Sequence, residues 1–235
     1  MSKDDSPLPE YDFVGGAMLL VNKPQNWTSF DVVNKIRYHL KKALHIKKIK
    51  VGHAGTLDPM ATGLLLICTG KATKNLADFQ NLSKEYTGTM TLGATTPSYD
   101  AETEIDQQYP IQHITIEQIE QARQQFVGPL EQIPPMFSAI KVDGQPLYKK
   151  ARKGETIAIA PRPVHIYELE WTRIALPEID FRVACSKGTY IRSLAHDFGR
   201  ALDSGAYLSA LCRTRVGDYR IEDAWELDDL LMKIG

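Results

Sequence analysis

The segment Gly52–Gly63, with the sequence GHAGTLDPMATG, constrains the fold of this 235-residue chain more than any other segment. Its three glycines permit conformations and close approaches that a β-carbon would forbid, while Pro59 biases Asp58 away from helical geometry. The apolar run Leu64–Ile67 follows directly and is typical of a buried strand. We therefore expect a shaped loop, anchored to a core, that holds the Asp58 carboxylate in a cleft. The residues alone also allow a simpler interpretation, in which Asp58 closes a turn with its own side chain.

Composition indicates an ordinary globular protein. With 43% hydrophobic and 24% charged residues, the chain is long enough to bury about 70% of its unfolded surface. The six histidines form no H-E-x-x-H cluster, and the three cysteines form no C-x-x-C pair, so we predict neither a metal site nor a disulfide framework (Cys68, Cys185, Cys212). The sequence shows no signal peptide and no membrane segment, so we expect a cytoplasmic protein.

Charge is strongly segregated although the net charge is only −1. From Lys35 to Lys50 every charged side chain is basic, whereas Asp218–Asp229 is mostly acidic. A local basic surface can bind phosphates even in a nearly neutral protein. The run also fits a solvated helix face. The position of this basic run directly before the Asp58 loop favours the interpretation that it binds RNA.

Periodicity predicts strands and helices in an irregular order. Alternation of apolar and polar residues predicts strands (Ala17–Asn22, Lys84–Leu92, Ile179–Cys185). Helical spacing predicts helices, the first two of which begin with a capping residue (Thr28 or Ser29 to Leu44, Thr115–Phe126, Tyr190–Leu202). We expect the apolar positions of these elements to face inward (Val33, Ile36, Leu40, Leu44, Tyr86, Met90, Leu92, Ile116, Ile119, Phe126, Leu194, Phe198, Leu202). Because no regular βαβ rhythm is present, the class is α+β with a largely antiparallel sheet.

We divide the chain into a flexible N-terminal tail at 1–14, a catalytic domain at 15–217 and a short acidic helix within 218–235, from about Glu222 to Met232. The segment 130–163 stands apart because it holds five prolines and a basic cluster. A long excursion of this kind inside a compact domain usually serves function. A plain surface insertion with a short amphipathic helix explains it equally well.

The segment GHAGTLDPMATGLLL is very similar to the catalytic motif of the TruB family, the tRNA pseudouridine-55 synthases. The resemblance continues in the family's order through four further segments (Leu19–Arg37, Lys84–Asp100, Ile133–Gly154, Ser186–Gly199). It implies the pseudouridine synthase fold, a central mixed and mainly antiparallel sheet with flanking helices and an active cleft. It also implies that 130–163 is a thumb that closes over RNA, and that the family's usual C-terminal domain of the PUA type is absent here.

The resemblance also implies roles for individual residues. Asp58 matches the essential catalytic Asp, Arg192 the Arg that pairs with that carboxylate, and Tyr86 the Tyr that lies against the uracil and moves the C5 proton. Further positions match residues that contact the RNA or line the pocket (His53, Tyr190, Leu211, Lys74, Asp100, Lys141, Arg152). Without the resemblance, Tyr86 would be a core aromatic, Arg192 a helix-surface residue and His53 a structural histidine.

The function that the resemblance implies is isomerisation of uridine 55 in the T loop of tRNA to pseudouridine. We expect the T-arm stem-loop as partner, base flipping, a monomer, and neither a nucleotide cofactor nor a metal. Two alternatives remain open: a tRNA-folding chaperone without turnover, and a pseudouridine synthase that acts on another RNA. A faint similarity of GLLLICTGKAT to a phosphate-binding loop fails on the spacing of its glycines.

Overall fold

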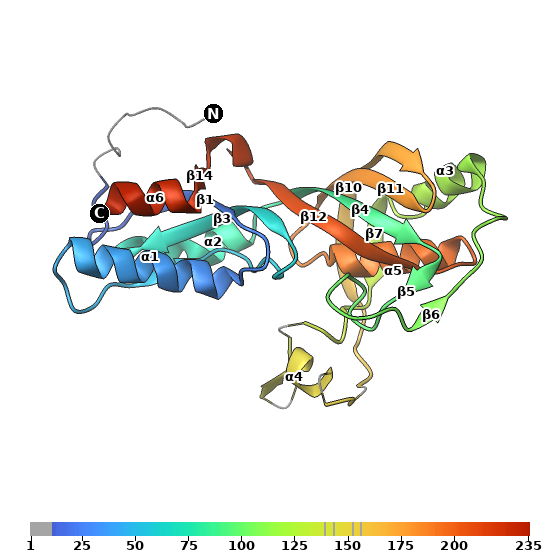
Figure 1. Ribbon diagram of the computed structural model, residues 1–235, viewed down its shortest axis with the longest axis horizontal. Coiled ribbons are helices and arrows are strands. Elements are labelled where there is room, and N and C mark those ends of the chain that lie inside the picture. The colour runs from blue at the N-terminus through green and yellow to red at the C-terminus, as the bar shows by residue number, and fades with distance from the viewer. Residues whose placement is uncertain (1–10, 139, 143, 152, 156) are drawn as a thin grey trace. The chain divides into compact units, whose positions relative to one another are not determined.

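The computed structural model describes residues 11–138, 140–142, 144–151, 153–155 and 157–235. The chain forms two compact units, of which the first contains the residues up to Leu82 together with Cys212–Gly235 and the second contains Ser83–Leu211. Strand β12 (Ala206–Val216) contributes residues to both units (Figure 1). Among the described residues, no helix is both long enough and apolar enough to cross a bilayer.

The first unit is a small sheet covered by helices. Its strands are hydrogen bonded in the order β14-β1-β3-β12, with β2 added on β3 and β13 on β12. Most of these pairs are antiparallel, but β1 is parallel to β14 and β12 is parallel to β3. The elements are β1 (Met18–Lys23), α1 (Ser29–Ala43), β2 (Val51–His53), β3 (Thr62–Thr69), α2 (Leu76–Gln80), β13 (Tyr219–Arg220), β14 (Trp225–Glu226) and α6 (Leu227–Ile234), with 3₁₀ turns at Gly70–Asn75 and Ile221–Asp223.

Helix α1 begins as the sequence predicts. Thr28 is the N-cap and forms a complete capping box with Asp31, which satisfies amide groups at the start of the helix. Val33, Ile36 and Leu40 are buried. The prediction for Leu44 was wrong: its side chain is exposed, because Leu44 lies beyond the last helical turn as the C-cap residue.

The larger of two core clusters in the first unit lies between its sheet and its helices α1 and α6 (Figure 1). Tyr11 and Phe13 pack against this core, although the sequence suggested a flexible tail as far as residue 14. Helix α6 begins at Leu227 rather than near Glu222, because a 3₁₀ turn and the short strand β14 precede it. Alternating burial along β1 places Leu19, Val21 and also Lys23 on the inner face.

The second unit is built on long antiparallel strands in the order β12-β4-β11-β10-β7. Two additional strand pairs, β5 with β6 and β8 with β9, lie outside this order. The elements are β4 (Lys84–Leu92), β5 (Ala94–Thr95), β6 (Gln107–Gln108), α3 (Ile116–Gln124), β7 (Gly128–Gln132), β8 (Lys141–Val142), β9 (Gln145–Pro146), α4 (Leu147–Ala151), β10 (Arg162–Ala175), β11 (Glu178–Cys185) and α5 (Ile191–Ala201).

Packing in the second unit follows most of the predicted pattern. The predicted inward face of β4 is buried at Tyr86, Met90 and Leu92, and the ring of Phe198 on α5 contacts other core rings (Phe126 at 5.6 Å, Trp171 at 4.9 Å between centroids). Thr115 and Gln118 form the predicted capping box of α3. The prediction for Ile116 was wrong, because this first residue of α3 points to solvent while the following turns bury Ile119 and Ala122. The α+β class with a mainly antiparallel sheet is confirmed.

Candidate active-site residues

Asp58 lies at the first position of a tight turn in the first unit. The amide of Ala61 donates to the carbonyl oxygen of Asp58 at 3.1 Å, and Pro59 occupies the second position, where its fixed φ suits a β-turn. The Asp58 side chain is half-buried. The turn at Pro59 therefore fixes the backbone of the half-buried Asp58; the cleft around its carboxylate stays a prediction.

Residues before and at the start of α1 hold this loop in place. The Ser29 hydroxyl accepts from the amide of Leu57 at 2.8 Å and donates to its carbonyl at 3.1 Å. The amide of Asn26 donates to the carbonyl of Pro59 at 2.8 Å. Hydrogen bonds on both sides of Asp58 thus tie the turn to α1 and to the segment that precedes it.

Lys23 is a fully buried lysine beside the same loop. Its ammonium donates to the carbonyls of Trp27 at 2.6 Å, Pro24 at 2.9 Å and Pro59 at 3.4 Å. The pKa of Lys23 is lowered from 10.5 to about 8, mainly by burial and in part by the charge of Arg213, whereas the negative charge of Asp58 opposes the shift. The charge of Lys23 therefore interacts with the charge of Asp58, the candidate catalytic carboxylate.

Arg213 on β12, in the C-terminal part of the chain, also supports the Asp58 loop. Only 1% of its surface is exposed; its Nε donates to the carbonyl of Leu64 at 2.8 Å and its Nη2 to that of Gly55 at 3.2 Å. Gly63 has a φ of 106°, and a β-carbon there would collide with the backbone of Arg213. Glycine is thus required where the loop enters β3.

Sequence reasoning missed both buried cations. Alternation along β1 could have revealed Lys23, because Leu19, Val21 and Lys23 share one face. Long basic side chains are almost never fully buried without partners, so the default expectation is an exposed lysine. Arg213 has no comparable signal, because burial along β12 does not alternate regularly.

His53 and Lys74 occupy different environments in the first unit. His53 on β2 is half-buried, and its Nδ1 has no hydrogen-bond partner among the described residues. Burial lowers the pKa of this imidazole, so it is neutral at neutral pH. Lys74 lies exposed in the 3₁₀ turn after β3. An exposed lysine there is free to meet a phosphate group.

A surface cavity of about 520 Å³ lies over the start of α1. Its volume falls in the range typical of ligand sites. Trp27 and Tyr38 supply aromatic rings, and 63% of Tyr38 is exposed. The remaining lining residues are polar or charged (Asn26, Asp31, Asn34, Lys35). Aromatic rings beside a lysine form a surface on which an unpaired base could stack.

Tyr86 lies in the second unit on the inner face of β4, with 8% of its surface exposed. It is paired with Val183 on β11. Two residues further along β4, Gly88 lies close against the backbone of β12, because a β-carbon at this position would lie 2.5 Å from the carbonyl oxygen of Ala210. Tyr190 and Leu211, the other predicted pocket residues, are both half-buried. The structure therefore buries Tyr86 almost completely and leaves Tyr190 and Leu211 partly accessible.

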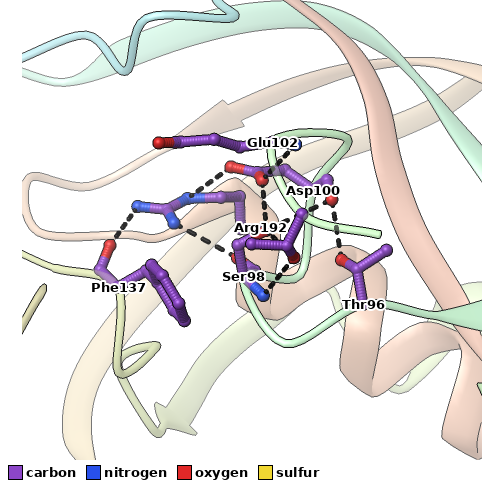
Figure 2. A network of polar contacts seen from close by, with 7 residues as sticks. Thr96, Ser98, Asp100, Glu102, Phe137 and Arg192 are labelled. Atoms are coloured by element: carbon purple, nitrogen blue, oxygen red, sulfur yellow. Dashed lines mark hydrogen bonds and ion pairs between the residues drawn. The ribbon is translucent and has the colours of Figure 1, made fainter. Parts of the chain in front are cut away.

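Arg192 on α5 is buried, so the alternative that it lies on the helix surface was wrong. Its Nη1 donates to the carbonyl of Ser98 at 3.2 Å and its Nη2 to that of Phe137 at 2.9 Å. Its Nε lies 3.5 Å from Oδ2 of Asp100, which is fully buried (Figure 2). Arg192 and Asp100, 92 residues apart, thus form a buried ion pair that was not predicted.

The loop around Asp100 is fixed by its own polar groups. Oδ1 of Asp100 accepts from the Ser98 hydroxyl at 2.5 Å and from the amide of Glu102 at 2.9 Å. The hydroxyl of Thr96 donates to the carbonyl of Asp100 at 2.7 Å (Figure 2). These bonds orient the carboxylate, and its second oxygen faces Arg192.

The predicted thumb is fastened to the start of α5. Gln132 exchanges two hydrogen bonds with the backbone of Tyr190, and the hydroxyl of Ser193 donates to the carbonyl of Ile133 at 2.8 Å. Lys141 lies in β8, and its side chain is not described; Arg152 lies outside the described residues. The segment therefore begins as an ordered part of the second unit, next to Arg192.

Within the first unit, the structure thus brings Asp58 together with Lys23 and Arg213. Within the second unit it brings Arg192 together with Asp100. The predicted pairing of Arg192 with Asp58, and the roles of the substrate-binding residues, remain predictions.

Comparison with known proteins gives a consistent result. The profile of the TruB family pseudouridylate synthase N-terminal domain matches residues 41–191, and that of the tRNA pseudouridylate synthase B C-terminal domain matches residues 192–234. The chain is 58% identical over 217 residues to the tRNA pseudouridine synthase B of Phocaeicola vulgatus, with 92% of each chain covered. It is 57% identical to that of Flavobacterium johnsoniae, with 92% of this chain and 95% of the relative covered.

Solved structures support the same fold. A chain of a Cbf5-Nop10-Gar1 complex matches with a TM-score of 0.70 and 29% identity, covering 98% of this chain and 61% of that chain. A chain of an H/ACA RNP bound to a substrate RNA containing 2'-deoxyuridine matches with a TM-score of 0.66 and 29% identity, covering 93% of this chain and 53% of that chain. The protein thus spans little more than half the length of these solved chains.

Proposed function

Because the chain belongs to the TruB family of pseudouridine synthases, we propose that it converts the uridine at position 55 of the tRNA T loop into pseudouridine. The observation that carries this proposal is the 58% identity, over 92% of both chains, to a relative named tRNA pseudouridine synthase B. The geometry of the Asp58 turn supports it, because hydrogen bonds fix the loop on both sides of Asp58, to Ser29 of α1 and to Asn26 before that helix.

The proposed reaction breaks the bond between C1′ of the ribose and N1 of uracil, turns the base and joins C1′ to C5. The C5 proton leaves and N1 gains one, so the isomerisation needs no oxidant. Asp58 acts as the nucleophile or as the charge that stabilises the separated sugar. Tyr86 moves the C5 proton, and its aromatic ring lies against the flipped base.

Arg192 orients the catalytic groups in this proposal. A guanidinium holds carboxylates through fixed, directional N–H groups. Arg192 is already anchored to the carbonyls of Ser98 and Phe137 and to Asp100. We assign it the additional role of partner to Asp58 during the reaction.

Binding of the RNA is assigned to the remaining predicted residues. Tyr190 and Leu211 line the pocket for the uracil, and His53, a neutral ring, occupies the space that the flipped nucleotide leaves. Lys74, Lys141 and Arg152 contact the RNA, whereas Asp100, which is fully buried, positions the protein loop that carries it. The basic run from Lys35 to Lys50 binds phosphates.

The T-arm stem-loop is the proposed partner, and the protein is proposed to act as a cytoplasmic monomer. Mapping of pseudouridine in an unmodified tRNA transcript tests the assignment. After incubation, a carbodiimide adduct should stop reverse transcriptase next to position 55 and nowhere else. A transcript with cytidine at that position is the matched control. A stop in another RNA but not at position 55 would support a different pseudouridine synthase, and tight binding without any stop would support the chaperone alternative.

A further inference from the structure

The loop that carries Asp100 turns through a left-handed residue, Tyr99, whose φ is 64°. A large side chain rarely adopts this conformation unless its surroundings hold it there. The amide of Tyr99 donates to the carbonyl of Thr96 at 3.1 Å, and its carbonyl accepts from the amide of Leu208 at 3.0 Å. The backbone next to Asp100 is therefore tied to β12 through a residue in an unfavourable conformation.

The ring of Tyr99 stacks on His196 of α5. The ring centroids are 3.8 Å apart and the planes differ by 12°. His196 follows Arg192 by four residues, so both side chains lie on one face of the helix. Helix α5 thus contacts the loop at two successive turns, through Arg192 with Ser98 and Asp100, and through His196 with Tyr99.

Both stacked rings are uncharged at neutral pH. Burial lowers the pKa of His196, and Arg200 adds to this effect while Asp106 opposes it. Burial and nearby Asp197 raise the pKa of the Tyr99 phenol. Nδ1 of His196 is buried and has no hydrogen-bond partner among the described residues. Packing of the rings, rather than a hydrogen bond at Nδ1, therefore orients the imidazole.

We infer that Tyr99 and His196 are positioning residues that hold the Asp100 carboxylate against Arg192. The stack fixes the left-handed residue directly before Asp100, and Arg192 lies one helical turn before His196. If the stack is lost, Asp100 and the guanidinium lose their fixed separation of 3.5 Å. This inference rests on the proposed function only where it predicts an effect on turnover.

Five variants, four single and one double, test the inference. Asn tolerates a positive φ but has no ring, so Tyr99→Asn removes the stack without adding backbone strain. His196→Ala removes the other ring, whereas Tyr99→Phe and His196→Phe each keep an aromatic ring at the substituted position. We expect the ring-deleting variants to lower the single-turnover rate about tenfold or more while RNA affinity stays within about threefold, and the two Phe variants to remain within about twofold of wild type. The double variant Tyr99→Asn with His196→Ala should be no slower than the worse single variant, because the two rings act as a unit.

A second measurement does not depend on turnover. The ¹⁵Nε–H signal of Arg192, assigned with Arg192→Lys, should shift in both ring-deleting variants and stay near its wild-type position in the Phe variants. The inference is overturned if this signal does not move, or if ring deletion changes only the melting temperature while turnover is retained. If the wild-type protein makes no pseudouridine, the proposed function fails, and the Arg192 signal alone decides the inference.

Discussion

Replacing Lys23 with Met should remove a pH-dependent component of stability that the wild-type protein shows between about pH 8 and pH 10.5. Lys23 is fully buried, and its pKa falls from 10.5 to about 8 in the folded state. Below pH 8 the folded protein holds a desolvated ammonium, and this penalty is fully present. As the pH rises, the folded state releases the proton before the unfolded state does, so the free energy of unfolding increases. The difference in pKa corresponds to about 3 kcal/mol at most.

Urea unfolding of wild type and Lys23→Met at several pH values between 7 and 10.5 measures this component. The stability of wild type relative to the variant should rise with pH, because titration of all other groups cancels in the difference. Asp58→Asn offers an independent check: without the Asp58 carboxylate the pKa of Lys23 should fall further, since that charge favours the ammonium. Parallel stability curves for wild type and Lys23→Met would refute the reasoning, because Lys23 would then titrate normally.

Three further predictions follow from the loop, the pocket and the basic run. Gly63→Ala should destabilise the protein by about 2–4 kcal/mol in urea unfolding, because its φ is 106° and a β-carbon would meet the backbone of Arg213; an unchanged midpoint would contradict this. Tyr86→Phe should bind tRNA normally but stall before product, as rapid-quench analysis can show; normal turnover would limit Tyr86 to stacking. Replacing three lysines after α1 with Ala should raise KM, keep kcat and flatten the salt dependence of binding (Lys47, Lys48, Lys50); an unchanged salt slope would remove them from the RNA surface.

Local patterns predicted helices α1, α3, α5 and α6 and strands β1, β3, β4 and β11, whereas the 14-residue strand β10 was not predicted. Thr28 with Asp31, and Thr115 with Gln118, start helices as capping residues because the required side-chain bonds involve only neighbours in the chain. Alternation also placed Tyr86 on the inner face of β4. The errors lie at helix ends, where spacing does not determine whether a residue still faces the core. Ile116 in the first turn of α3 is an example.

The environment of the candidate site was less predictable than its residues. The glycines and Pro59 around Asp58 indicated a shaped loop, but the cations that support it come from β1 and β12 (Lys23, Arg213). The ion pair of Arg192 with Asp100 joins residues 92 positions apart, and the Tyr99–His196 stack joins the same two segments. Such contacts depend on how distant segments of the chain pack together. Neither the periodicity nor the spacing of residues in a single sequence reveals this packing.

Release of tritium from tRNA that contains 5-tritiated uridine tests the central claim most directly, because forming the bond from C1′ to C5 expels the C5 hydrogen. The wild-type protein should release tritium from position 55. Asp58→Asn should release none above background while binding tRNA within about a few-fold of wild type, because the amide keeps the size of the side chain but is not a nucleophile. Release by Asp58→Asn at a rate near that of wild type would contradict the assignment of Asp58 as the catalytic residue.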